Sequence, residues 1–167
     1  QRIKEDAEPV QLGSATPAGV QVMGIGLTLH TAVWGRAQLV IKLDLKNSFN
    51  LVQRAAIMEA ARSRHGLSSC VRYWETESRP RSPIFIMDSR GHLAQAPFDS
   101  AEGAQQGSEY GAKGHNAAYQ ECFDAVNAFL QPHGGVLRAD CDDTVLVAPP
   151  SVVGEAFERL VTAVAER

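Results

Sequence analysis

The chain has 167 residues, of which 44% are hydrophobic and 21% charged, so it suits one folded domain, or a piece of a larger one, and not a disordered segment. Its formal net charge of −3 excludes the strongly basic balance that is typical of nucleic-acid-binding domains. No apolar run reaches the roughly 18–20 residues that cross a bilayer, and three cysteines argue against a closed disulfide framework. We therefore expect an intracellular protein with no membrane partner.

The first half of the chain predicts one strand and several helices. Apolar residues alternate with mixed ones in the strand, and they recur at helical spacing after it. The expected elements are a loop at 9–20, a helix at 21–36, a strand at 38–44 that ends on Asp44, a polar turn at 46–50, and helices at 51–64 and 68–78.

The second half of the chain begins with a hairpin and ends with a helix. Residues 83–96 predict two strands, 84–87 and 92–94, joined by a DSRG turn. After this hairpin we expect a polar, Gly-rich loop at 100–111, a long helix at 112–130, a strand GGVLRAD, a tight CDD turn, a strand TVLVAP and an amphipathic helix with Ser151 as its N-cap.

Without the hairpin at 83–96, the order of elements is β-α-β-β-α. This order predicts an α+β fold of the ferredoxin-like split βαβ type, in which helices cover one face of an antiparallel sheet. The last strand of that pattern is missing, so we expect a partial domain whose remaining strand lies beyond Arg167.

The predicted topology brings acidic residues together at one edge of the sheet. Asp142 and Asp143 occupy the turn of the central hairpin, and Asp44 ends the neighbouring strand. Carboxylates this close repel one another, and divalent cations relieve the repulsion. Oxygen ligands favour Mg²⁺, and two such ions support phosphoryl or nucleotidyl transfer. The alternative is a solvated turn, because Asp-Asp pairs are common in turns.

Three segments resemble, in order, motifs A, B and C of reverse transcriptases, and the resemblance is closest to the enzymes of non-LTR retrotransposons. These segments are KLDLKNSFN at 42–50, SAEGAQQGSEYG at 100–111 and ADCDDTVLVAPP at 139–150. QLGSATPAGVQVM at 11–23 is similar to the stretch that precedes motif A in the family. Together the matches cover most of the chain, and the complete series in order is far more specific than the Asp-Asp pair alone.

The resemblance implies an RNA-directed DNA polymerase, a nucleotidyltransferase of a retrotransposon-like element. Residues 1–37 would be the end of the fingers and the segment before motif A. Residues 38–167 would be the palm, truncated before its last strand and the thumb. The implied partners are an RNA template, a DNA primer, deoxynucleoside triphosphates, and the missing fingers and thumb of a longer protein. The location would be nuclear if the element is eukaryotic.

The resemblance also implies metal ligands. Asp44 and Asp142 would hold two Mg²⁺ ions, with Mn²⁺ as a possible substitute, and Asp143 would assist. The backbone carbonyl of Leu45 would contact the metal ion that accompanies the nucleotide.

Nucleotide-binding residues follow from the same motifs. Phe49 matches the bulky ring that rejects a ribose 2′-hydroxyl, because the ring leaves no room for the extra oxygen. Gln106 and Gly107 match the residues that line the nucleotide and template pocket. Lys46, next to motif A, would balance charge near phosphate.

The sequence departs from the family pattern in two places, and alternatives stay open. Ser108-Glu109 replaces the usual Asp-Pro of motif B, and Asp140 replaces an aromatic residue. If the strand alternates through the turn, Asp140 and Asp142 share one face. One alternative is a catalytically inactive or decayed reverse-transcriptase-like scaffold that binds nucleic acid. A palm-fold phosphotransferase such as a nucleotidyl cyclase is another, although motif B speaks against it. His115 and the other scattered histidines are expected at the surface or in caps.

Overall fold

The computed structural model describes residues 26, 38–63, 67–77, 81–105, 108 and 110–167. Among these residues, no helix is long and apolar enough to cross a membrane. Most of the predicted helix at 21–36 lies outside the described residues. The described strands are β1 (Leu39–Asp44), β2 (Ser82–Met87), β3 (Leu93–Ser100), β4 (Val136–Asp140) and β5 (Asp143–Ala148). The described helices are α3 (Ser48–Leu51), α4 (Arg54–Ser63), α5 (Val71–Glu77), α6 (Gly111–Leu130) and α7 (Pro150–Ala165), with short 3-10 helices η2 (Ser68–Cys70) and η3 (Gln131–His133).

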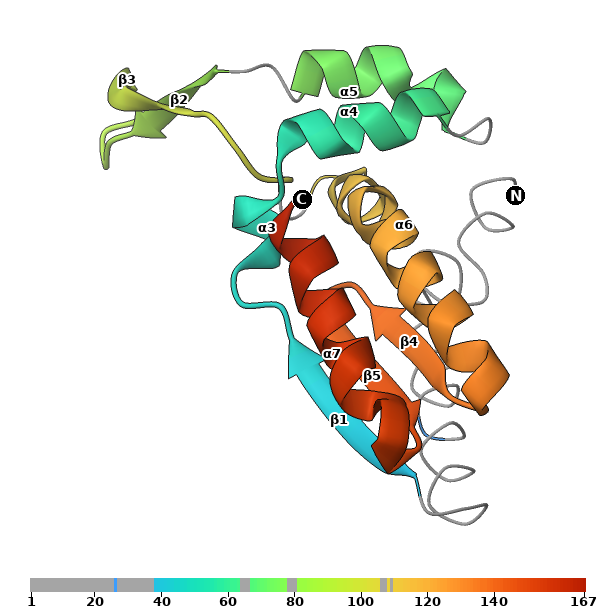
Figure 1. Cartoon of the computed structure of the whole chain (residues 1–167). Coiled ribbons are helices and arrows are strands. Elements are labelled where there is room, and N and C mark those ends of the chain that lie inside the picture. Colours follow the sequence, from blue (N-terminus) through green and yellow to red (C-terminus); the bar gives the residue numbers. More distant parts are fainter. Residues whose placement is uncertain (1–25, 27–37, 64–66, 78–80, 106–107, 109) are drawn as a thin grey trace.

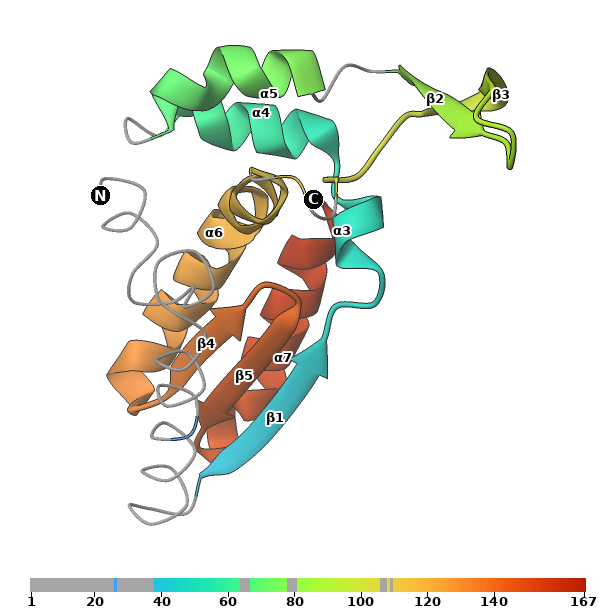
Figure 2. The same ribbon diagram turned by 180° about the vertical axis from the view of Figure 1, so that it is seen from behind.

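The main sheet has three antiparallel strands in the order β1-β5-β4. Helices α6 and α7 lie on one face of this sheet, as the two opposite views show (Figures 1 and 2). Alternate residues of β4 and β5, such as Leu137 and Leu146, are fully buried in the core that also holds Phe123 of α6 and Leu160 of α7. The predicted α+β architecture, an antiparallel sheet with helices on one face, is confirmed.

Helix α4 packs against α6 above the end of the sheet, and α5 packs against α4 (Figure 1). Gly114 allows α6 to approach Ile57 of α4 and Trp74 of α5 closely. A Cβ atom at Gly114 would lie 3.1 Å from Cγ2 of Ile57 and 3.3 Å from Nε1 of Trp74. Ile57 and Trp74 are each 2% exposed. The core therefore continues from the sheet into this second helical layer.

Two local predictions were wrong. The polar turn expected at 46–50 is a turn only at its start, since Ser48 begins the four-residue helix α3. The buried side chain of Ser48 and backbone bonds from Leu51 to Asn47 and from Val52 to Ser48 stabilise that helix. Helix α7 begins at Pro150 with Pro149 as N-cap, so Ser151 lies inside the helix. Proline suits the first helical position because its φ is preset and it has no N–H group to satisfy.

The hairpin of β2 and β3 projects away from the helices (Figures 1 and 2). Its second strand, β3, is longer than the predicted strand at 92–94. The pairing of the two strands is irregular between Pro83 and Phe85 and then continues as far as Ser82 and Ser100. The Asp88 carboxylate accepts hydrogen bonds from the backbone of Arg90 and His92 and so closes the turn. Several apolar side chains on this hairpin are exposed, including Phe85 at 59% and Leu93 at 69%.

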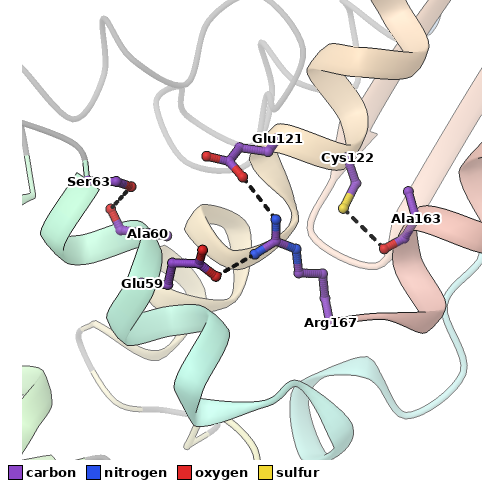
Figure 3. A network of polar contacts seen from close by, with 7 residues as sticks. All are labelled: Glu59, Ala60, Ser63, Glu121, Cys122, Ala163 and Arg167. Atoms are coloured by element: carbon purple, nitrogen blue, oxygen red, sulfur yellow. Dashed lines mark hydrogen bonds and ion pairs between the residues drawn. The ribbon is translucent and has the colours of Figure 1, made fainter.

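Arg167 joins the end of α7 to two other helices (Figure 3). Its guanidinium lies 3.0 Å from Glu59 of α4 and 2.9 Å from Glu121 of α6. Its backbone carbonyl accepts a hydrogen bond from the N–H of Gln53 at 2.7 Å. The Arg167 side chain is only 21% exposed, so it is held more firmly than an ordinary surface arginine.

We expect Arg167→Ala to lower the free energy of unfolding by about 1 kcal/mol, at the upper end for partly exposed ion pairs, because two partners lose their cation. Arg159→Ala is the matched control. Arg159 pairs with Glu155 on its own helix, an arrangement that contributes about 0.3–0.5 kcal/mol. Urea denaturation of both variants measures the difference, and equal losses would contradict a clamping role for Arg167.

Candidate active site

Three aspartates form a row across the ends of the three strands. Asp143, at the start of the central strand β5, pairs with Asp44 on one side and with Asp140 on the other. Side chains that lie directly opposite in an antiparallel pair share one face of the sheet. The row therefore concentrates negative charge at one end of that face.

Asp142 lies beside this row, in the turn between β4 and β5. The N–H of Leu45 donates a hydrogen bond to the carbonyl of Asp142 at 3.1 Å, which ties the end of β1 to the turn. The predicted convergence of Asp44 with the Asp142–Asp143 segment is therefore present in the backbone.

The turn itself has an unusual backbone conformation. Cys141, the first of its two loop residues, has a φ of 55°, the left-handed region in which type II′ hairpin turns normally place glycine. Such a conformation costs a non-glycine residue about 1–3 kcal/mol. Asp142 is the second loop residue, so the strand alternation that would have put Asp140 and Asp142 on one face is interrupted.

Cations near the carboxylates are unevenly distributed. Lys42 lies 3.0 Å from Asp143, in a pair whose side chains are 68% and 50% exposed. Within the described part of the chain, neither Asp44 nor Asp142 has a cationic partner. Lys46 is exposed in the turn that follows Leu45. Asp140 has no cationic partner there either, so of the four carboxylates only Asp143 is paired with a cation of the described residues.

The carboxyl group of Asp140 is partly buried beside two other aspartates. Burial, and then the neighbouring charges of Asp143 and Asp142, raise the pKa of Asp140 above its ordinary value of 3.8. The folded protein therefore takes up a proton at Asp140 at a higher pH than the unfolded chain does. Above that range the Asp140 charge destabilises the fold, and the penalty disappears as the pH falls through the raised pKa.

We expect Asp140→Asn to raise the free energy of unfolding at pH 7 by about 0.2–1 kcal/mol, the range for a cross-strand pair. The gain should shrink as the pH is lowered toward the ordinary aspartate value, because wild-type Asp140 is then neutral as well. Denaturation curves at several pH values measure it, with the exposed Asp99→Asn as control. A gain that stays constant with pH would contradict the assignment.

The nucleotide-binding residues predicted by resemblance are only partly described. Phe49 lies half-buried in α3, with its ring stacked on the ring of His115. Gln106 and Gly107 lie outside the described residues. The loop just before them is docked on α3, because the N–H of Ala104 donates to the carbonyl of Phe49 at 2.6 Å and that of Gly103 donates to Val52 at 3.1 Å.

Ser108, where the family has aspartate, holds a neighbouring helix. Its hydroxyl donates a hydrogen bond to Glu77 at the end of α5, at 2.6 Å, and accepts one from the backbone N–H of Tyr110 at 3.3 Å. The serine thus has a local structural partner of its own.

His115 was placed wrongly by sequence reasoning. It is 0% exposed and hydrogen-bonded to the equally buried side chains of Ser48 and Asn116. His115 lies in a stretch of α6 whose residues are mostly buried, and that stretch could have indicated its burial. Lys113 and Gly114, which precede His115, made the stretch look like a weak and exposed helix start.

The described residues contain no group of three or more His, Cys, Asp and Glu side chains arranged to hold a metal ion. Asp44 and Asp142, the residues that the sequence motifs assign to a cation, contribute two carboxylates at this edge. Mg²⁺ is commonly bound by one or two carboxylates together with substrate phosphates, not by a closed protein cage. The donor chemistry of Asp44 and Asp142 fits that mode.

Comparison with known proteins identifies solved structures with a similar fold. No protein-family model matches the chain, and no curated protein does. Among solved structures, the telomerase of Candida albicans in complex with the TWJ fragment of telomeric RNA has a TM-score of 0.66 at 12% identity, over 96% of this chain. Apo telomerase of Candida tropicalis, truncated from its C-terminal domain, has a TM-score of 0.62 at 12% identity, over 98% of this chain. The chain spans 31% and 35% of those two chains. It therefore has a reverse-transcriptase-like fold.

Proposed function

We propose that the chain is the palm portion of an RNA-directed DNA polymerase. One observation carries this proposal: on a reverse-transcriptase-like fold, the backbone brings Asp44 to the turn that holds Asp142. The 3′-hydroxyl of a DNA primer would lose its proton and attack the α-phosphate of a deoxynucleoside triphosphate at this edge of the sheet, forming a phosphodiester bond while the α–β phosphoanhydride bond breaks and pyrophosphate leaves.

The residues at the edge suit two Mg²⁺ ions shared with the triphosphate, and Mn²⁺ would use the same oxygen donors. Asp44 and Asp142 would hold the ions, with Asp143 assisting while it pairs with Lys42. The Leu45 carbonyl accepts the N–H of Ser48 and has a second lone pair for a ligand. When bound, the ions lower the pKa of the attacking hydroxyl and stabilise the leaving group.

The other residues of the motifs bind and select the nucleotide. The Phe49 ring would occupy the space that a ribose 2′-hydroxyl needs, so that the hydroxyl meets an apolar surface and loses its hydrogen bonds. Lys46 is exposed and would approach the triphosphate. Gln106 and Gly107 would line the nucleotide and template, as motif B implies.

The partners of this function are an RNA template and a DNA primer, with the fingers and thumb supplied by a longer protein. The span of about a third of the telomerase chains supports that expectation. The assignment to a retrotransposon-like element of the non-LTR type, with a nuclear location in a eukaryote, rests on the sequence motifs alone.

A second candidate is a reverse-transcriptase-like scaffold without catalysis. Asp140 favours it, because this fourth carboxylate crowds the turn and has a raised pKa. Ser108 favours it too, since its hydroxyl is engaged by Glu77. The available carboxylates of Asp44 and Asp142 support the enzyme instead.

Primer extension distinguishes the two candidates. The chain, in a form extended at both ends to carry the fingers and thumb that this proposal expects, is incubated with a labelled DNA primer on an RNA template, deoxynucleoside triphosphates and MgCl₂, and the product length is measured. The polymerase predicts lengthening that requires both the template and the metal. Binding of the primer–template without lengthening, in Mg²⁺ and in Mn²⁺, would support the scaffold.

A further inference from the structure

A chain of buried polar side chains connects three segments of the candidate active site. Nε2 of His115, in α6, lies 2.9 Å from the hydroxyl of Ser48 in α3, and its Nδ1 lies 3.1 Å from Oδ1 of Asn116. The exposed fractions are 0% for His115, 5% for Ser48 and 2% for Asn116. The Asn116 side chain also hydrogen-bonds Cys141 in the turn before Asp142.

The partners fix the direction of these bonds. Oδ1 of Asn116 only accepts, so Nδ1 of His115 carries the hydrogen and donates it. Nε2 then accepts a hydrogen bond from the Ser48 hydroxyl. The amide N–H of Asn116 remains to donate to the Cys141 sulfur. Burial lowers the pKa of His115 below its ordinary value of 6.5, which agrees with the neutral ring that this pattern requires.

The same imidazole supports the ring of Phe49. The two rings stack with centroids 4.2 Å apart and planes at 6°, and Tyr119 meets the imidazole edge-on at 4.9 Å. Helix α3 has only four residues and no side-chain cap, so its own hydrogen bonds hold it weakly. His115 therefore contacts two consecutive residues of α3, one through a hydrogen bond and the next through its ring face.

We propose that His115 is a positioning residue that fixes the Phe49 ring and thereby sets the selection of deoxyribose over ribose. The inference rests on the proposed function, in which Phe49 meets the sugar of the incoming nucleotide. A ring free to rotate about its side-chain bonds would leave room for a 2′-hydroxyl. A ring stacked on a hydrogen-bonded imidazole stays in one orientation and excludes it.

Two substitutions separate the stacking from the hydrogen bonds. His115→Phe and His115→Leu both remove the bonds to Ser48 and Asn116, but only phenylalanine keeps an aromatic face against Phe49. The measurement is the ratio of kcat/KM for a deoxynucleotide to kcat/KM for its ribonucleotide in primer extension. We expect His115→Leu to lower this ratio by about tenfold, the scale of a lost aromatic pair, and His115→Phe, which keeps the stacking and loses the hydrogen bonds, to lower it by only about threefold.

Ser48→Ala is the variant to use if neither His115 variant folds, as judged by circular dichroism. It removes only the hydroxyl that orients the imidazole, and we expect a smaller fall in the ratio, about threefold, the scale of one hydrogen bond.

The outcomes separate this inference from the proposed function. A ratio that falls clearly further in His115→Leu than in His115→Phe supports the inference. If the wild-type protein discriminates and every folded variant keeps the wild-type ratio, the inference is overturned but the proposed polymerase function is not. If the wild-type protein neither adds nor binds either kind of nucleotide, the proposed function is wrong, and the inference is wrong with it.

Discussion

Replacing Asp142 by asparagine is expected to slow primer extension by about 10²–10³-fold or more, the loss that follows removal of one preorganised electrostatic group from an active site. Asparagine keeps the size of the side chain but has no charge and only one oxygen to offer a cation. The backbone carbonyl of Asp142, which accepts the N–H of Leu45, is untouched, so the turn should still form. Single-nucleotide addition under saturating template and primer measures the effect.

Asp99→Asn is the matched control for this variant. Asp99 is exposed on β3 of the projecting hairpin and lies outside the motifs, so the same chemical change should leave the rate within about twofold of wild type, as expected for a surface substitution. Full activity in Asp142→Asn, with an unchanged thermal transition, would remove Asp142 from the reaction.

Replacing Gly103 by alanine is expected to lower the free energy of unfolding by about 3–5 kcal/mol, which is a large effect for one methyl group. Gly103 has a φ of 81°, and a Cβ atom there would lie 2.6 Å from the carbonyl oxygen of Asn50 and 2.8 Å from that of Phe49. Backbone strain alone costs about 1–3 kcal/mol. The clash adds to it, because both contacts are with backbone that cannot move without disturbing α3.

Gly134→Ala separates strain from contact. Gly134 has a φ of 70°, but nothing lies within 4 Å of the position of its Cβ atom. Its replacement should cost about 1–2 kcal/mol, the strain of the left-handed region alone. Equal losses in the two variants would show that the loop of Gly103 is not held against the helix that carries Phe49. Denaturant titrations of both proteins give the comparison.

The sequence was sufficient to predict the backbone of the site. Alternation in the two strands around Asp140 and Asp143, and the β-α-β-β-α order, place Asp44 beside the turn, because in this pattern the first strand pairs with the second strand of the hairpin, as β1 pairs with β5. The same order of elements also predicts that the helices lie on only one face of the sheet. These features depend on local periodicity and on topology, both of which a sequence carries.

The details that depend on contacts between distant segments could not be predicted. Helix α3 forms where a turn was expected, because Ser48 finds a partner in His115, 67 residues away. Gly114 allows α6 to lie close to Ile57 and Trp74, a contact with residues 57 and 40 positions earlier in the chain. Asp140 faces Asp143 across the hairpin, since the two-residue turn interrupts the alternation on which the sequence argument depended.

The most direct test of the account is a calorimetric titration of MnCl₂ and a deoxynucleoside triphosphate into the wild-type protein and into Asp44→Asn, Asp142→Asn and Asp99→Asn. If Asp44 and Asp142 share a cation with the nucleotide, binding of the triphosphate to wild type and to Asp99→Asn will require the metal. In the other two variants the affinity will fall by about tenfold or more, the scale for a charged hydrogen-bonding partner. Equal affinity for the nucleotide in all four proteins, or affinity that is indifferent to Mn²⁺, would contradict the account.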